Sequence, residues 1–429
     1  MERRPAEHEK FYFYNSSFDA LELVKKHTLN EQEPTEGWLT NAFGVLINPK
    51  YLPEILAGHE GRVEGAPIPA NWHSDLAEFG AVFRAIELAP GPKFTMFELG
   101  CGWGCWMNIS GVVARRAGLE CMLYGIEGDE GHVQFAKECL QKNGFGQNQF
   151  NVEWGIAAAD TGFALFPKQE TSGVSWGGEP IFDKSEIDAK KLVATGKYEI
   201  LPQKSLEIEA RHLDRIDLLH IDIQGGELNL ITKSMNFLNK KVAYIMVGTH
   251  SRQIEGGLFE QFVNHGWTLE IERPAILHVG DNPNVLVDGV QGWRNPRLLS
   301  DTDLNKVSVK GELVIQAYSS DIVADSTVQL EVLINNQSGS DWKGEGIHPV
   351  NLSYHWLNKK GKPIVFDGIR TSLLGTCIRA GETKTQTITV KAPSNPGDYQ
   401  LQVTMVQEGI QWFESAGFKT SFVPVQVSL

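Results

Sequence analysis

Short apolar runs alternate with amphipathic stretches between residues 94 and 289. The amphipathic stretches predict helices, with examples over 106–117, 132–142, 227–238 and 258–265. This alternation predicts an α/β fold with a doubly wound, mostly parallel sheet of seven strands. The predicted strands are 94–99, 122–126, 150–157, 216–222, 242–247, 267–272 and 284–289.

The pattern changes after residue 311. Short alternating runs separated by Asn, Gly and Pro turns follow one another to the end of the chain. Such spacing is typical of an all-β, immunoglobulin-like sandwich. The predicted strands are 313–318, 328–334, 351–357, 385–390, 399–406 and 422–427.

These patterns divide the chain into four parts. We expect an N-terminal cover segment at 1–90, an α/β domain at 91–297, a polar linker at 298–310 and the sandwich at 311–429. Trp72 and His73 of the cover segment are candidates for contact with a substrate. Residues 161–210 are long for one connection and predict a mobile loop with a functional use.

Composition narrows the class of protein. With 429 residues, 41% hydrophobic and 21% charged, the chain has the profile of a soluble globular protein. Its net charge of −14 argues against binding nucleic acid through a broad basic surface. No apolar run is long enough for a transmembrane helix, and the N-terminus lacks a signal-peptide core. Five cysteines without zinc-finger spacing favour reduced thiols and a cytoplasmic location.

The most informative stretch is a strand that runs into glycines. Strand 94–99 is followed by Gly100, Gly102 and Gly104, and then by a helix-like run. Glycine allows close approach of a ligand to the backbone, and the helix start offers free N–H groups to an anion. A tight structural turn is the alternative explanation. The spacing is not the G-x-G-x-x-G of a dinucleotide site, because residue 105 is Cys.

Two acidic residues suggest S-adenosylmethionine (SAM) as the ligand. Glu98 precedes the glycines and suits the ammonium group of SAM, whereas Glu127 ends the next strand and suits the ribose hydroxyls. The turn after strand 150–157 lies at the same edge of the predicted sheet. The residues expected to bind SAM are Glu98, Gly100, Cys101, Gly102, Gly104, Glu127, Ile156 and Ala157.

The catalytic candidates end neighbouring strands. Asp222 emerges after the buried strand 216–221, Glu227 begins the next helix, and His250 follows strand 242–247. Methyl transfer to a hydroxyl requires that its proton be removed. We expect His250 to be the base, Asp222 to orient it or to bind a metal, and Glu227 to support both. If a divalent cation such as Mg²⁺ is required, Asp222 and Glu227 are its expected ligands; alternatively, Asp222 caps the helix and His250 is structural.

The sequences FELGCGWG at 97–104, GIEG at 125–128 and IDLLHIDIQGGE at 216–227 resemble the FkbM-type SAM-dependent methyltransferases. The resemblance spans roughly residues 70–295 and implies the methyltransferase sheet. It also implies O-methylation of sugars, glycolipids or secondary metabolites. His220 and Gln224 stand where the family has Lys and Glu, which leaves the path of the proton open.

The C-terminal part is similar to sandwich domains of bacterial surface-polysaccharide enzymes and to the sugar-recognition domain of O-antigen exporter ATPases. The similarity lies in residues 351–357, 367–371, 396–399 and 412–413. It implies a carbohydrate-binding domain. Its candidate aromatic contacts are Trp342, Tyr354, Trp356, Trp412 and Phe413, of which we expect one or two at most to be exposed.

Together these patterns predict a SAM-dependent O-methyltransferase. Its expected acceptor is a sugar hydroxyl of a surface polysaccharide, a glycolipid or their precursor, with the sandwich gripping the glycan. An O-methyltransferase for secondary metabolites and a non-catalytic glycan-binding scaffold are the alternatives. Neither the acceptor nor the oligomeric state follows from the sequence.

Overall fold

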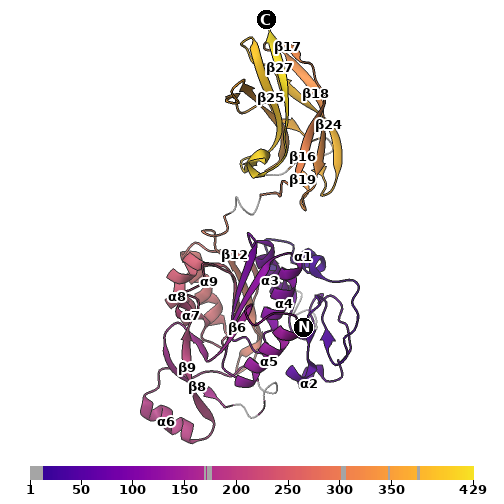
Figure 1. The fold of residues 1–429 in the computed structure, drawn as a ribbon. Helices are drawn as coiled ribbons and strands as arrows, with labels where there is room; N and C mark the ends of the chain where they lie inside the picture. Colours follow the sequence, from indigo (N-terminus) through magenta and orange to yellow (C-terminus); the bar gives the residue numbers. More distant parts are fainter. Residues whose placement is uncertain (1–12, 169–170, 172–175, 301–305, 346–347, 374–376) are drawn as a thin grey trace. The chain divides into compact units, whose positions relative to one another are not determined.

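The computed structural model describes residues 13–168, 171, 176–300, 306–345, 348–373 and 377–429. The chain divides into two compact units, residues 1–300 and residues 301–429 (Figure 1). Part of the predicted linker, residues 301–305, lies outside the described residues.

The first unit is built on a mixed sheet of eight strands in the order β1-β12-β15-β11-β10-β4-β5-β6. Five neighbouring strands, from β6 to β11, are parallel, and β15 is antiparallel to both of its neighbours. The prediction of seven strands missed β1, which is too short to carry a periodic pattern. The strands are β1 (Asn15–Ser16), β4 (Lys93–Leu99), β5 (Glu120–Glu127), β6 (Phe150–Trp154), β10 (Ile216–Ile221), β11 (Val242–Thr249), β12 (Thr268–Arg273) and β15 (Gly289–Arg294).

The last predicted strand of this sheet was misplaced. Residues 284–287 form β14 (Asn284–Val287), which pairs with β13 (Ile276–His278) in a separate hairpin. The sheet strand is β15, and all six of its residues are buried. Its sequence, GVQGWR, hides this burial because Gln291 and Arg294 are polar. Both find partners inside: Gln291 accepts from Trp293, and Arg294 pairs with Glu270 at 2.7 Å.

The predicted strand 150–157 is interrupted at Gly155, whose φ of 154° ends β6. Residues beyond it form β7 (Ile156–Ala158) in a small sheet with β9 (Tyr198–Ser205) and β8 (Gly162–Pro167). The stretch 161–210 predicted as one loop therefore carries two strands and two helices, α6 (Glu186–Ala194) and α7 (Leu206–Glu209). Its residues 169–170 and 172–175 lie outside the described residues.

Helices cover both faces of the main sheet (Figure 1). Successive strand residues face opposite ways: Met96 packs with α3, α4 and α5, whereas Phe97 packs with α8 and α9. The core-facing sides of these helices are apolar, which fixes the layered arrangement. The helices are α3 (Leu76–Glu87), α4 (Cys105–Arg116), α5 (Glu130–Lys142), α8 (Glu227–Lys241) and α9 (Arg252–Asn264).

The described part of the N-terminal segment shares the core of this unit. Val24 of α1 (Ala20–His27) and Tyr51 of a 3₁₀ helix, η2 (Pro49–Tyr51), are buried in the same cluster as the side chains of α3 and α4. The remaining short elements are β2 (Leu39–Thr40), β3 (Leu46–Ile47) and α2 (Pro53–Leu56).

The second unit is all-β, as predicted, and has one apolar core between two main sheets. Trp342 and Trp356 are fully buried in this core. One sheet has the order β16-β18-β24 and the other β17-β27-β25-β20-β21, with β22 and β26 attached; β19 and β23 form a separate pair. The strands are β16 (Gly311–Ala317), β17 (Asp321–Val323), β18 (Thr327–Asn336), β19 (Trp342–Lys343), β20 (Val350–Asn358), β21 (Pro363–Val365), β22 (Thr371–Ser372), β23 (Cys377–Ile378), β24 (Thr383–Lys391), β25 (Gly397–Gln407), β26 (Gln411–Trp412) and β27 (Ser421–Ser428), with a 3₁₀ helix, η3, at Phe413–Ala416.

Among the described residues, no helix combines the length and the apolar character needed to cross a bilayer.

Candidate active site

The glycine-rich loop joins β4 to α4 and crosses the end of β10. Gly100 and Gly102 have positive φ values of 74° and 51°. A Cβ atom on Gly100 would lie 1.9 Å from the carbonyl oxygen of Asp222, so no other residue fits there. Gly104 begins α4 without a side-chain cap. The loop is therefore held against the end of the neighbouring strand.

The two acids expected to bind SAM are buried and already engaged. Glu98 Oε2 accepts from the backbone N–H of Met107 in the first turn of α4, and its Oε1 lies 3.3 Å from His220 Nδ1. Glu127 accepts from the N–H groups of Gly102 and Asp129 at 2.7 and 2.8 Å. Both carboxylates thus shape the glycine loop and its surroundings.

A cleft opens beside this loop at the carboxyl ends of the parallel strands. It contains about 960 Å³ of empty space, part of it open to solvent. Seven of the eight residues expected to bind the cofactor line it, and Gly104 does not; Asp222 also lies in the wall, whereas Glu227 and His250 do not. The seven are Glu98, Gly100, Cys101, Gly102, Glu127, Ile156 and Ala157.

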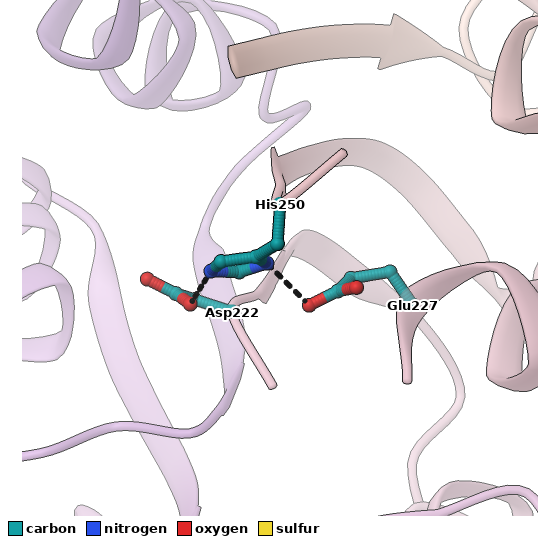
Figure 2. A group of neighbouring side chains, drawn as sticks. All are labelled: Asp222, Glu227 and His250. Atoms are coloured by element: carbon teal, nitrogen blue, oxygen red, sulfur yellow. Dashed lines mark ion pairs between the residues drawn. The ribbon is translucent and has the colours of Figure 1, made fainter. Parts of the chain in front are cut away.

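The three catalytic candidates meet in one cluster (Figure 2). His250 Nε2 lies 3.1 Å from Asp222 Oδ1, and His250 Nδ1 lies 2.9 Å from Glu227 Oε1. The Glu227 side chain is fully buried and also accepts from the N–H groups of Ile223 and Gly225. The Asp222 side chain is 43% exposed, so it is the member of the cluster that a ligand can reach.

The sequence is also similar to a curated protein of Jannaschia sp. (strain CCS1) described as a "Putative methyltransferase". The two are 40% identical over 263 residues, which cover 61% of this chain and 94% of that protein. This chain belongs to the methyltransferases. No family model matches it.

Solved structures resemble the methyltransferase only weakly. The METTL16 methyltransferase domain is 13% identical, with a TM-score of 0.28, over 50% of this chain and 64% of that one. M. capricolum TrmK, solved with the cofactor product S-adenosyl-homocysteine, is 9% identical, with a TM-score of 0.28, over 50% of this chain and 67% of that one. The functional argument therefore rests on the curated relative and on the geometry of the cleft.

His250 of the methyltransferase is held as a cation. Burial favours the neutral ring, but the hydrogen bonds and charges of Asp222 and Glu227 raise the pKa of His250 to about 10. Burial alone would raise the pKa of Asp222, but the hydrogen bond and charge of His250 hold it below its usual value. At neutral pH His250 is therefore an imidazolium beside the ionised Asp222.

This charge state predicts a pH-dependent stability. A histidine whose pKa rises from 6.5 to about 10 on folding stabilises the fold fully below pH 6.5. We expect the free energy of unfolding, measured by urea denaturation, to fall as pH rises between these values, by at most about 1.4 kcal/mol per pH unit. His250→Gln should flatten this slope, and His212→Gln, at an exposed histidine, should not. Equal slopes in wild type and His250→Gln would contradict the assignment.

The cluster does not suit Mg²⁺. One ligand atom from each of Asp222, Glu227 and His250 lies within 4.8 Å of the others. However, the carboxylates contact opposite edges of the imidazole (Figure 2), so the cationic ring already occupies the space between the two expected ligands. Mg²⁺ also prefers oxygen ligands in octahedral geometry. The geometry favours an imidazolium that is ion-paired with a carboxylate at each ring nitrogen.

Two histidines line the cleft although the sequence analysis placed neither of them among the residues expected to bind SAM or to catalyse the reaction. His73 lines the cleft of the methyltransferase, and burial together with the charge of His220 lowers its pKa to about 4. His220 pairs with Glu98 and also lines the cleft. Trp72 instead donates to Glu64 and is not in the wall. The position of His73 depends on how the N-terminal segment packs, whereas that of His220 depends on its place on β10 beside β4.

The aromatic residues of the second unit are mostly core. Trp342, Tyr354, Trp356 and Phe413 are at most 2% exposed, and Trp412 is half-buried beneath Arg370. This agrees with the expectation that one or two at most would be exposed. Trp412 is the only one of these five that a sugar ring could reach.

Proposed function

We propose that this methyltransferase uses SAM to methylate a hydroxyl of a sugar, in a surface polysaccharide, a glycolipid or their precursor. The observation that carries the proposal is the cleft in which a glycine loop and Asp222 share one wall. The FkbM-type motifs support transfer to oxygen, and the second unit would then grip the glycan. An acceptor hydroxyl on a secondary metabolite is the alternative.

The cleft fits SAM in its residue types. Gly100 and Gly102 line the cleft and present only backbone to it, which lets a nucleoside approach the main chain. Gly100, Cys101, Gly102, Ile156 and Ala157 would hold the cofactor, with Glu98 and Glu127 supporting the loop around it. Four carboxylates and no Lys or Arg are among the described residues of the wall, which suits a cationic ligand. The bound sulfonium supplies a methyl carbon and departs as a neutral thioether.

We assign the base to Asp222, which revises the role first expected for His250. A protonated imidazole cannot accept a proton, whereas the ionised carboxylate of Asp222 can. Its Oδ1 lies 3.1 Å from His250 Nε2 and accepts a hydrogen bond from the Gln224 amide at 3.0 Å, and these contacts orient the group. With SAM bound to supply the methyl group, Asp222 would accept the proton that the acceptor hydroxyl loses. His250 and Glu227 position that carboxylate.

The cellular location stays a proposal as well. All five cysteines, each within the described residues, are free thiols, and four of them are buried. Free thiols are consistent with a reducing cytoplasm.

Titration calorimetry and a labelled-methyl assay test this function. We expect SAM and S-adenosyl-homocysteine to bind, and label to pass from SAM to at least one glycan or glycoside of a panel. Dialysis against EDTA should leave the rate unchanged, because the imidazolium occupies the predicted metal position. No binding of either ligand would favour a non-catalytic glycan-binding scaffold, and loss of activity in EDTA would reinstate the metal.

A further inference from the structure

A second cavity adjoins the cleft. It contains about 900 Å³ of empty space, part of it open to solvent, and it shares four wall residues with the first: Ala157, Pro180, Ile223 and Gln224. The rest of its wall comes from residues 158–160, 179, 182–183, 203 and 225–226, and from Asn229, Leu230 and Lys233 of α8. Nothing in the proposed cofactor site uses this space.

The second cavity reaches the proposed base through Gln224. The backbone of Gln224 has a φ of 55°, an uncommon value for a residue other than glycine. Its side-chain amide donates to Asp222 Oδ1, and the residue lies in the walls of both cavities. A molecule in the second cavity therefore lies next to the strand end that carries Asp222. An acceptor site must hold the reacting hydroxyl close to the base, and the second cavity is close to Asp222.

The charges around both cavities disfavour acceptors that carry a phosphate group. The described residues of the second wall include Asp160, Glu179 and Asp183 and a single cation, Lys233, which is paired with Asp160 at 2.5 Å. Glu179 and Asp183 have no ion-pair partner among the residues that the structure describes. Because the described residues of the first wall include no Lys or Arg either, a phosphate here would face carboxylates without a nearby cation. Such like-charge contacts disfavour the binding of an anion.

Uncharged polar groups line the same space. Gln203, Gln224 and Asn229 contribute side-chain amides, and Gly225 and Gly226 contribute exposed or half-buried backbone. Amides and carboxylates both form hydrogen bonds with hydroxyl groups. This lining suits a molecule with many hydroxyls and no anionic group.

We propose that the second cavity is the acceptor site, and that it takes an uncharged, polyhydroxylated acceptor and rejects phosphorylated or nucleotide-linked forms of the same sugar. The inference rests on the proposed function and narrows it. Methylation would then act on the glycan itself, before phosphate activation or after its removal.

Matched acceptors test the inference. Label transfer from SAM is measured for methyl glycosides, the corresponding sugar 1-phosphates and the corresponding nucleotide sugars. We expect kcat/KM at least about 100-fold higher for a glycoside than for its phosphate, a difference of about 2.7 kcal/mol. Equal or better use of the phosphates would overturn the acceptor class.

Two variants test whether residues of the second cavity determine the preference for the uncharged acceptor. The double variant Glu179→Lys/Asp183→Lys should reduce the ratio of kcat/KM for the glycoside to kcat/KM for its phosphate at least tenfold. The control, Glu186→Lys/Asp214→Lys, changes exposed residues outside both walls and should leave this ratio unchanged. Asn229→Trp should raise the KM for the glycoside at least tenfold by filling the cavity. An unchanged preference and an unchanged KM would place the acceptor elsewhere.

Measurements of SAM binding distinguish a failure of the proposed function from a failure of the acceptor-site inference. All of these variants should bind SAM with the wild-type Kd, because the altered residues lie outside the first wall. If wild type neither binds SAM nor labels any acceptor, the proposed function itself fails. If it binds SAM and labels phosphorylated sugars, only the acceptor site is wrong.

Discussion

Asp222→Asn is expected to lower the rate of methyl transfer about 10²- to 10⁴-fold, the range for loss of a general base. The amide keeps a side-chain oxygen that can accept from His250 and Gln224, so the fold and the cleft should persist. What is lost is the negative charge that receives the hydroxyl proton. The measurement is kcat for label transfer, with the Kd for SAM determined in parallel and expected to stay within a few-fold of wild type.

The control for this change is Asp214→Asn, at an exposed acid outside the cleft, which should retain full activity. Glu227→Gln provides a graded comparison. It removes one of the two carboxylates that hold His250, and its effect should be smaller because Asp222 keeps its charge. Asp222→Asn with activity within threefold of wild type would exclude Asp222 as the base.

Gly100→Ala is expected to weaken SAM binding at least 100-fold. The new Cβ would lie 1.9 Å from the carbonyl oxygen of Asp222, and the positive φ of Gly100 adds about 1–2 kcal/mol of backbone strain. The loop and the end of β10 must then separate, which deforms the cleft from both sides. Calorimetry with SAM measures the loss, and thermal denaturation measures the cost to the fold.

Gly118→Ala tests the effect of backbone strain at a positive φ without the steric clash that Gly100→Ala creates. Gly118 has a φ of 87°, but its Cβ would meet no atom within 4 Å. This variant should lose about 1–2 kcal/mol of stability and still bind SAM normally. If both variants bound SAM equally well, the close approach of the loop to β10 would have no part in forming the site.

Much of the first unit was predictable because its signals are local. The glycine loop, Glu127 and Asp222 each follow a continuous apolar strand, and parallel strands bring their carboxyl ends to one edge. The cluster of Asp222 and His250 follows from the same rule, because β10 and β11 are neighbours. The immunoglobulin-like topology of the second unit and the binding of a glycan there remain predictions.

The features that were missed depend on long-range packing. β15 is buried but polar at Gln291 and Arg294, so its sequence resembles a surface segment. The charge of His250 requires Glu227, which is fully buried and meets the ring from the opposite edge. A sequence pattern reports neither the depth of a carboxylate nor the group that it faces. For this reason the sequence alone favoured His250 as the base, whereas our proposal assigns that role to Asp222.

The position of β15 has a consequence for how the protein folds while it is being synthesised. β15 is the last strand of its sheet along the chain, yet it lies between β11 and β12, which precede it. Those two strands cannot be bridged until residue 294 has left the ribosome. Up to that moment a nascent chain holds two unsatisfied strand edges, which are prone to pair with other chains. A product truncated before residue 289 should therefore aggregate rather than persist as a smaller enzyme.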